Sequence, residues 1–262
     1  MILAADNIRI TNSIIQRAVN NMDTAQVQGM AVKLQTEGAN WIDINPGPLK
    51  SDPEKKMEFL VNSIQEVTDI PIILDTTNPA AIKEGLIISK NKAIINGFSL
   101  EHDKLARILP LAAEFNADII GYLLDSNGHP PSDTRERLSI AIELYQKCME
   151  AGISENKLII DPIVAPLLWN DGTKRNMELL KIIRMLPEIL GFPVKIIAGL
   201  SNLTSGIKDN YKKNILQTAY LSMLSASGLT IVLMNMLNKH PVETAKACNL
   251  ITRERPFSVF EL

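Results

Sequence analysis

Short apolar segments that end in a polar residue recur along this chain. The clearest lies at residues 71–78, Pro-Ile-Ile-Leu-Asp-Thr-Thr-Asn, where a run too short for a helix ends in Asp75. Such a run is typical of a strand buried on both faces of a parallel sheet. Strands are predicted over residues 2–8, 41–45, 72–75, 93–96, 118–124, 158–161, 194–198 and 230–234.

The stretches between these runs carry helical spacing. After Asp52-Pro53, for example, Met57, Leu60 and Ile64 recur on one helical face, which predicts an amphipathic helix packed against a sheet. Pro110 is expected to break the helix that contains it. Helices are predicted over about 12–20, 24–37, 53–67, 79–89, 105–115, 132–152, 174–186 and 211–226, and after Pro241.

Eight strands alternating with helices predict a parallel sheet. No shift in composition and no linker divides the chain, so we expect one domain over residues 1–262. Eight such units in about 250 residues fit a closed (β/α)8 TIM barrel better than two separate sheets.

Composition and charge exclude several classes of protein. Lys and Arg number 27 and Asp and Glu number 29, which gives a net charge of −2 and a pI of about 6.0. This balance offers no electrostatic footprint for a nucleic acid. The apolar runs are far shorter than the ~18 residues of a membrane span, and the start of the chain lacks the basic segment of a signal peptide. A cytoplasmic protein is expected.

Cysteine and histidine offer no metal site or disulfide. Cys148 and Cys248 lie 100 positions apart in helical contexts, and no Cys-x-x-Cys pair is present. His102, His129 and His240 are scattered without ligand spacing. No bound metal is therefore predicted.

The polar residues at the strand ends are the candidate site. In a barrel of parallel strands these ends converge on one mouth, where ligands bind. A set rich in carboxylates and amides suits a neutral heterocycle with several N–H and C=O groups better than a phosphate, which needs cations. Some such residues serve only as helix N-caps, the role we assign to Asp52 and Asn78. The candidates are Asp43, Asn45, Asp75, Asn96, Asp161, Asn202 and Asn235, with Asp6 and Asp125 as weaker ones.

Five motifs resemble those of the pterin-binding methyltransferases. They are Asp-Ile-Asn-Pro-Gly-Pro at 43–48, Leu-Asp-Thr-Thr-Asn at 74–78, Ile-Ile-Asn at 94–96, Ile-Ile-Asp-Pro at 159–162 and Gly-Leu-Ser-Asn at 199–202. The resemblance keeps order and spacing over nearly the whole chain. Members of this family are barrel enzymes that move a methyl group between methyltetrahydrofolate and a corrinoid protein, whose cobalamin is carried by that partner.

The resemblance implies roles for these residues. Asp75, Asn96 and Asp161 would hydrogen-bond the pterin ring, Asn202 would lie beside the ring nitrogen that carries the methyl group, and Asp43 would complete the network. Asp75, Asp161 and Asn202 would form the catalytic group. The remaining members of the substrate-binding set would be Asn45, Ser201, Lys208 and Asn235.

The chain also departs from the family pattern. Lys208 stands where relatives have Arg, which keeps the charge and loses the forked geometry. Residues 5–9, Ala-Asp-Asn-Ile-Arg, stand where relatives have Gly-Glu-Arg-Ile-Asn. These departures favour methyl flow from the methylcorrinoid protein of a demethylation system to tetrahydrofolate. The opposite flow, from methyltetrahydrofolate to the corrinoid iron–sulfur protein of the acetyl-CoA pathway, is the alternative.

Two other functions compete. A dihydropteroate synthase would share the pterin-binding barrel, but its reaction expels pyrophosphate and its relatives carry Arg-x-His where this chain has Met-Asn-Met at 234–236. A catalytically silent pterin-binding protein is disfavoured because Asp75 and Asn202 are both present.

The expected partners follow from the barrel geometry and the resemblance. A corrinoid protein must approach the mouth, so the loops at 46–52, 125–131 and 203–210 are predicted to form its docking rim. The resemblance also implies a homodimer.

Overall fold

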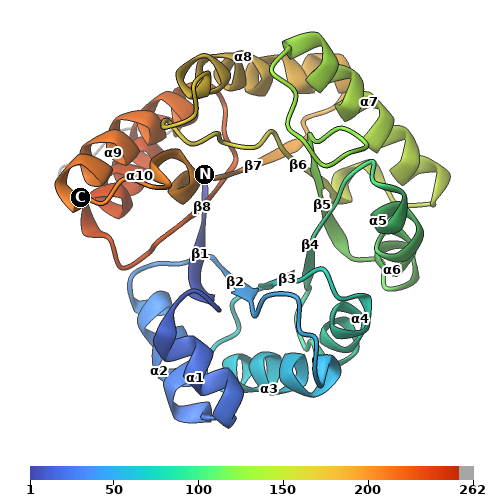
Figure 1. The fold of residues 1–262 in the computed structure, drawn as a ribbon, viewed down its shortest axis with the longest axis vertical. Coiled ribbons are helices and arrows are strands. Elements are labelled where there is room, and N and C mark those ends of the chain that lie inside the picture. The colour runs from blue at the N-terminus through green and yellow to red at the C-terminus, as the bar shows by residue number, and fades with distance from the viewer. Residues whose placement is uncertain (254–262) are drawn as a thin grey trace.

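The computed structural model describes residues 1–253, within which eight parallel strands close into one barrel in chain order (Figure 1). The predicted single-domain TIM barrel is confirmed. The strands are β1 (Ile2–Arg9), β2 (Trp41–Asn45), β3 (Ile72–Asp75), β4 (Ile94–Phe98), β5 (Asp118–Tyr122), β6 (Leu158–Asp161), β7 (Lys195–Gly199) and β8 (Ile231–Met234).

Helices surround the barrel and cover its outer face (Figure 1). None of those within residues 1–253 combines the length and the apolar character that a membrane span requires. The α-helices are α1 (Ser13–Asn21), α2 (Thr24–Thr36), α3 (Pro53–Gln65), α4 (Pro79–Ile88), α5 (His102–Arg107), α6 (Leu109–Glu114), α7 (Thr134–Glu150), α8 (Gly172–Leu190), α9 (Asn210–Ala226) and α10 (Lys239–Ile251), and the two 3-10 helices are η1 (Glu155–Lys157) and η2 (Leu200–Thr204).

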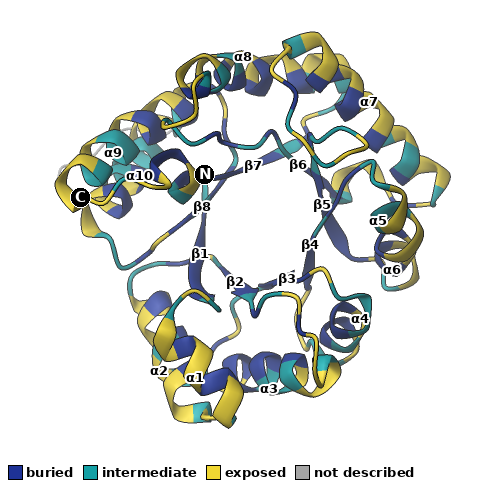
Figure 2. Cartoon of the chain, viewed as in Figure 1, coloured by how far each residue is buried: buried dark blue, intermediate teal, exposed yellow. Residues whose placement is uncertain are grey.

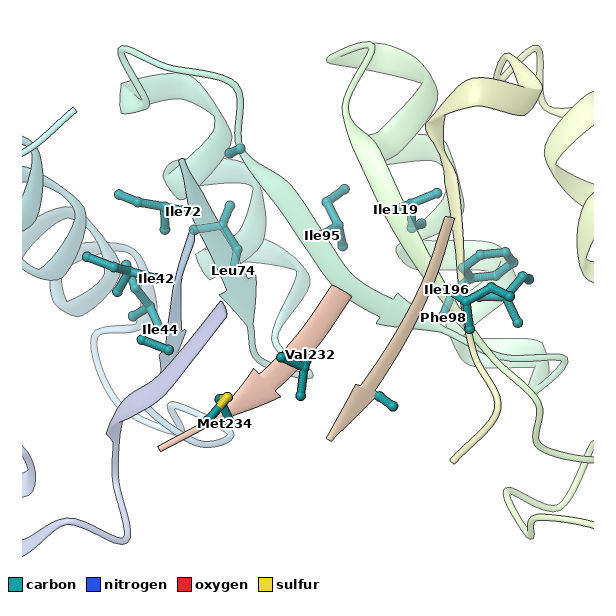
Figure 3. Packing of buried hydrophobic residues seen from close by; sticks show 14 of the residues in the cluster. Ile42, Ile44, Ile72, Leu74, Ile95, Phe98, Ile119, Ile196, Val232 and Met234 are labelled. Atoms are coloured by element: carbon teal, nitrogen blue, oxygen red, sulfur yellow. The ribbon is translucent and has the colours of Figure 1, made fainter. Parts of the chain in front are cut away.

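Each strand divides its side chains between two cores. Alternate residues such as Ile42, Leu74 and Ile95 point outward into the larger core, against the buried faces of the helices (Figures 2 and 3). The residues between them point into the barrel, where branched side chains fill the interior so that no pore remains. This inner layer consists of Ala4, Ile73, Ile94, Ile120, Ile159, Ile197 and Ile231.

The chemistry of the inward positions changes directly above this layer. Two residues further along β3, β4, β5 and β6, the next inward side chains are Asp75, Asn96, Tyr122 and Asp161. On β2 the register pairs Asp43 with Ile73, so Asp43 lies one layer deeper than Asp75 and is buried. Polar groups therefore form the floor of the mouth, and the isoleucine layer supports them from below.

The helix boundaries confirm most of the sequence predictions and correct one. The helical segment around Pro110 breaks at Ile108 into α5 and α6, as expected. Asn78 is the N-cap of α4, with its side-chain oxygen accepting from the backbone N–H groups of Ala80 and Ala81. Asp52 occupies the N-cap position of α3, but its backbone is left-handed (φ +49°) and its side chain makes no capping hydrogen bond. The predicted capping role of Asp52 was therefore wrong.

Asn78 should contribute measurably to stability. Asn78→Ala removes the cap of α4 and the amide hydrogen bond to the Leu49 carbonyl (3.1 Å). We expect the free energy of unfolding to fall by about 1–2 kcal/mol in urea denaturation. Asn78→Ser keeps a capping oxygen and should lose less. Equal losses in both variants would show that the cap contributes nothing.

Candidate active site

Asp75 is held at the mouth by the end of the neighbouring strand. The Asn45 amide donates a hydrogen bond to Asp75 Oδ2, and Asn45 Oδ1 accepts from the Gly47 N–H at 3.2 Å. The Thr76 hydroxyl donates to the Gly47 carbonyl at 2.8 Å. These contacts tie the loop after β2 to the end of β3, so that Asp75 and Asn45 stand side by side.

Asn96 lies between Tyr122 and Asp43. The Tyr122 hydroxyl donates to Asn96 Oδ1 at 2.6 Å, and Asn96 Nδ2 lies 3.4 Å from Asp43 Oδ1. Because a phenol donates here to the amide oxygen, the amide nitrogen is directed toward the carboxylate. Tyr122 was missed in the sequence analysis, although it is the next inward residue after Ile120 on β5, as Asn96 is after Ile94 on β4.

Asp161 and Asp6 complete the cluster of carboxylates. Asp161 is the last residue of β6, and its Oδ1 accepts from the Ile163 N–H at 2.8 Å. Asp6 is buried at an irregularity of β1, where Oδ2 lies 3.3 Å from Arg9 Nη1 and Oδ1 has no hydrogen-bond partner within residues 1–253. We call Asp6, Asp43, Asp75 and Asp161, with Asn45, Asn96 and Tyr122, the mouth cluster.

Burial disfavours the charged form of the carboxyl groups in the mouth cluster. Burial raises the pKa of Asp161 to about 7, and raises that of Asp75 to about 6 against the opposing effects of Asn45 and Lys104. The pKa of Asp43 is raised well above its usual range by burial first and then by the charges of Asp75 and Asp6. The cluster can therefore hold or release protons near neutral pH.

A large polar cavity opens beside the mouth cluster, above β7 and β8. It has a volume of about 560 Å³, and Ser201, Asn202 and Asn235 line it. Gly199 leaves the inward position of β7 without a side chain, and a Cβ there would lie 3.2 Å from Asn202 Nδ2. We call this cavity the β7–β8 pocket. The other residues that line it are Arg9, Leu200, Thr204, Ser205, Gly206, Asn210, Lys213, Asn214, Gln217, Met234, Leu237, Asn238 and Pro241.

A smaller cavity of about 270 Å³ lies on the opposite side, above β3 to β5. Asp75, Asn96 and Tyr122 line it from the barrel, and Lys104 of α5 lines it from outside. The Lys104 ammonium lies 5.3 Å from the centre of the Tyr122 ring. The mouth cluster therefore borders this smaller cavity directly, whereas none of its residues lines the β7–β8 pocket.

Asn235 joins the two strands that close the barrel. Asn7 Nδ2 donates to Asn235 Oδ1 at 2.7 Å, while Asn7 Oδ1 accepts from the Met236 N–H at 3.0 Å. Asn7 is the second polar residue that the sequence analysis missed, because it gives no motif of its own. Asn235 lines the pocket with its side-chain oxygen already engaged.

Two sequence candidates lie apart from both the mouth cluster and the β7–β8 pocket. Lys208 is exposed in the loop before α9 and lines neither cavity. Asp125 accepts hydrogen bonds from the backbone N–H groups of Asn127 and His129, so it stabilises its own loop. Within residues 1–253 no three His, Cys, Asp or Glu side chains gather in a way that could hold a metal ion.

Two arginines fix the loops next to Asp161. Arg137 is buried and donates to the carbonyl of Pro131 at 2.6 Å and to that of Pro162 at 3.3 Å. Arg175 donates to the carbonyl of Pro130. The 125–131 loop is therefore anchored at its C-terminal end by side chains of α7 and α8.

A match to a family model identifies the protein family of this chain. The family model described as "Pterin binding enzyme" matches residues 9–236, which include the mouth cluster except Asp6. The chain belongs to the pterin-binding enzyme family. The sequence identity to individual relatives is low, and the names of these relatives describe different reactions.

Two curated relatives carry methyltransferase or synthase names. The methylcorrinoid:tetrahydrofolate methyltransferase of Eubacterium limosum is 22% identical over 211 residues, covering 79% of this chain and 76% of that protein. The methionine synthase of Mycobacterium tuberculosis is 23% identical over 202 residues, which are 74% of this chain and only 17% of that enzyme.

Solved structures show the same barrel. The 7,8-dihydropteroate synthase of Vibrio fischeri ES114 superimposes with a TM-score of 0.71 over 97% of this chain and 94% of that one, at 18% sequence identity. At this identity the likeness establishes the fold and leaves the reaction open.

The raised pKa of Asp161 predicts a pH-dependent stability. Between about pH 4 and pH 7 the unfolded chain loses the proton of Asp161 while the folded chain retains it, so stability falls as the pH rises. Asp161→Asn keeps an acceptor for the Ile163 N–H and removes this cost. We expect the variant to be more stable than the wild type at pH 8, on the order of 1–3 kcal/mol, and equally stable at pH 4.

Thermal or urea unfolding at both pH values would test this. Asp125→Asn is the matched control, because hydrogen bonds from the His129 and Asn127 N–H groups lower the pKa of Asp125, and its substitution should give no gain at pH 8. A gain for Asp161→Asn that is the same at both pH values would contradict the assignment.

Proposed function

We propose that this enzyme transfers a methyl group between a corrinoid protein and N5 of tetrahydrofolate, in the direction from methylcorrinoid to folate. The observation that carries the proposal is the set of carboxylates and amides at the carboxyl ends of the strands, with Asp75 on β3, Asn96 on β4 and Asp161 on β6, and Asn202 in η2 directly after β7. Membership of the pterin-binding family and the name of the Eubacterium relative support it.

The mouth cluster suits the polar edge of a pterin. The pyrimidine part of a pterin presents an N–H, an exocyclic amino group, a ring nitrogen and a carbonyl, so it needs both acceptors and donors. Asp75 and Asp161 supply acceptors, and the Asn96 amide supplies a donor whose direction Tyr122 fixes. Each buried carboxylate that receives two N–H groups regains much of the stabilisation it lost on leaving water.

The proton balance of the reaction fits carboxyls that titrate near neutral pH. Methyl transfer to N5 would form an N–C bond while the bond between the methyl group and the donor cobalt breaks, with that electron pair leaving on the cobalt, and N5 would carry a positive charge until its proton departs. In reverse, N5 must gain a proton or a strong hydrogen bond before the N–C bond breaks. Asp75 and Asp161, with pKa values of about 6 and 7, can accept and return that proton through the polar network.

Asn202 has a different role from the carboxylates. It belongs to η2, it is exposed, and it cannot titrate at neutral pH. Its amide can orient N5 and stabilise the charge that develops there, and it lies where a docked protein can approach. The corrinoid, carried by the partner, would supply the cobalt centre that exchanges the methyl group.

The partner is proposed to dock on the rim formed by the loops at 46–52, 125–131 and 203–210. Arg137 and Arg175 anchor one of these loops, so that part of the rim is preorganised. A homodimer remains part of the proposal. A dihydropteroate synthase activity would need cations for its pyrophosphate at the end of β8, where residues 234–236 are Met-Asn-Met.

Calorimetric titration with tetrahydrofolate, followed by an anaerobic assay with methylcobalamin as methyl donor, tests the proposal. Wild-type protein should bind tetrahydrofolate and form methyltetrahydrofolate. Asp75→Ala should lose most of the binding because it removes an acceptor and releases Asn45. Dihydropteroate formation in place of methyl transfer would overturn the proposed reaction, and absence of any folate binding would overturn the site.

Asn202→Ala separates binding from chemistry. Because Asn202 acts at N5 and the ring is held by the mouth cluster, kcat should fall at least tenfold while KM for tetrahydrofolate changes less than about threefold. The melting temperature should stay at the wild-type value, since the side chain is exposed. Wild-type turnover in this variant would place the reacting nitrogen elsewhere.

A further inference from the structure

Charge is segregated between the mouth cluster and the β7–β8 pocket. The mouth cluster holds four carboxylates, whereas the described residues that line the pocket include Arg9 and Lys213 and no acidic side chain. A cavity of about 560 Å³ with two cations and no carboxylate is matched to an anionic ligand. The pterin ring is neutral, so the ring alone gives no reason for these cations.

Lys213 is available to a ligand. It lies in the first turns of α9, half-buried, and lines the pocket. Within residues 1–253 its ammonium makes no ion pair or hydrogen bond. The preceding residue, Lys212, is exposed and does not line the pocket.

Arg9 links the pocket to the mouth cluster. It ends β1, its Nη1 lies 3.3 Å from Asp6 Oδ2, and its side chain is 42% exposed. A guanidinium carries five donors, so one contact with Asp6 leaves several for a second anion. Arg9 thus stands at the entrance from the mouth, while Lys213 approaches the pocket from α9.

The amides of the pocket are already ordered. Asn238 Nδ2 donates to Asn214 Oδ1 at 2.8 Å, and Gln217 Nε2 donates to Thr204 Oγ1 at 2.8 Å. These bonds hold the side chains of α9 against η2 and the start of α10. A ligand with an amide and carboxylates would meet partners that need little rearrangement.

We propose that the β7–β8 pocket binds the acidic benzoyl-glutamate tail of the reduced folate, with Lys213 and Arg9 pairing with its carboxylates. The inference rests on the proposed function. In tetrahydrofolate the tail leaves the ring from C6, the atom next to N5. Asn202, placed at N5, also lines the pocket, so a tail that begins there runs directly into it. The volume lies within the usual range for a group of this size.

The test compares a ligand with the tail and one without it. Tetrahydrofolate and 6-methyltetrahydropterin are titrated calorimetrically into the wild type, Lys213→Met, Lys213→Arg and the control Lys212→Met. We expect Lys213→Met to weaken tetrahydrofolate binding about five- to tenfold, with Lys213→Arg restoring most of it. Binding of the tail-less pterin should be the same in all four proteins. Added salt should weaken only tetrahydrofolate.

The outcomes separate this inference from the proposed function. If the wild type binds both ligands and Lys213→Met binds tetrahydrofolate as tightly as Lys212→Met does, the tail pocket is wrong and the pterin site stands. If the wild type binds neither ligand, both proposals fall. Inorganic pyrophosphate is the third probe. If it binds in a Lys213-dependent way while tetrahydrofolate binding ignores Lys213, the pocket is a phosphate site and the tail assignment is overturned.

Discussion

The gathering of four carboxylates in one desolvated mouth is the constraint on which the rest of the site depends. The strand register brings these carboxylates together. It places Asp75 and Asp161 directly above the isoleucine layer, and it places Asp43 one layer deeper. Burial disfavours the ionised form of these carboxyl groups, and for Asp43 the charges of Asp75 and Asp6 add to that cost. Each carboxyl group must either accept N–H groups from a ligand or keep its proton. The raised pKa values of Asp75 and Asp161 show that the protonated forms are favoured.

The protein itself supplies some of these N–H donors. Asn45 serves Asp75, Asn96 approaches Asp43, and the Ile163 N–H serves Asp161. Within residues 1–253, the carboxylate oxygen of the mouth cluster that is buried without a hydrogen-bond partner is Asp6 Oδ1. A buried acceptor without a partner costs free energy, which a ligand N–H group placed there would recover.

The polar residues at the carboxyl ends of the strands could be predicted from the sequence, because in each case a short apolar run stops at a carboxylate or an amide. Asp75 and Asp161 stand out in this way, and the register confirms that they reach the mouth. Tyr122 could not be found so, because a tyrosine that ends an apolar strand looks like packing until the register shows it opposite Asp161. For Asp52 the residue type predicted a cap, which its backbone conformation does not allow. For Asp125 the hydrogen bonds within its loop could not be predicted from residue type.

Lys213 was beyond sequence reasoning for a further physical reason. It lies in a helix, and nothing in the spacing of α9 says that one of two adjacent lysines faces a cavity. Only the packing of α9 against η2 and α10 makes Lys213 half-buried and leaves Lys212 exposed. Lys208, on the loop before α9, lines neither cavity. The two cations of the β7–β8 pocket therefore come from different elements, Lys213 from α9 and Arg9 from β1. In the proposed assignment the carboxylates of the mouth cluster would hold the ring and Lys213 would hold what the ring carries, while Arg9, which also contacts Asp6, would link the two.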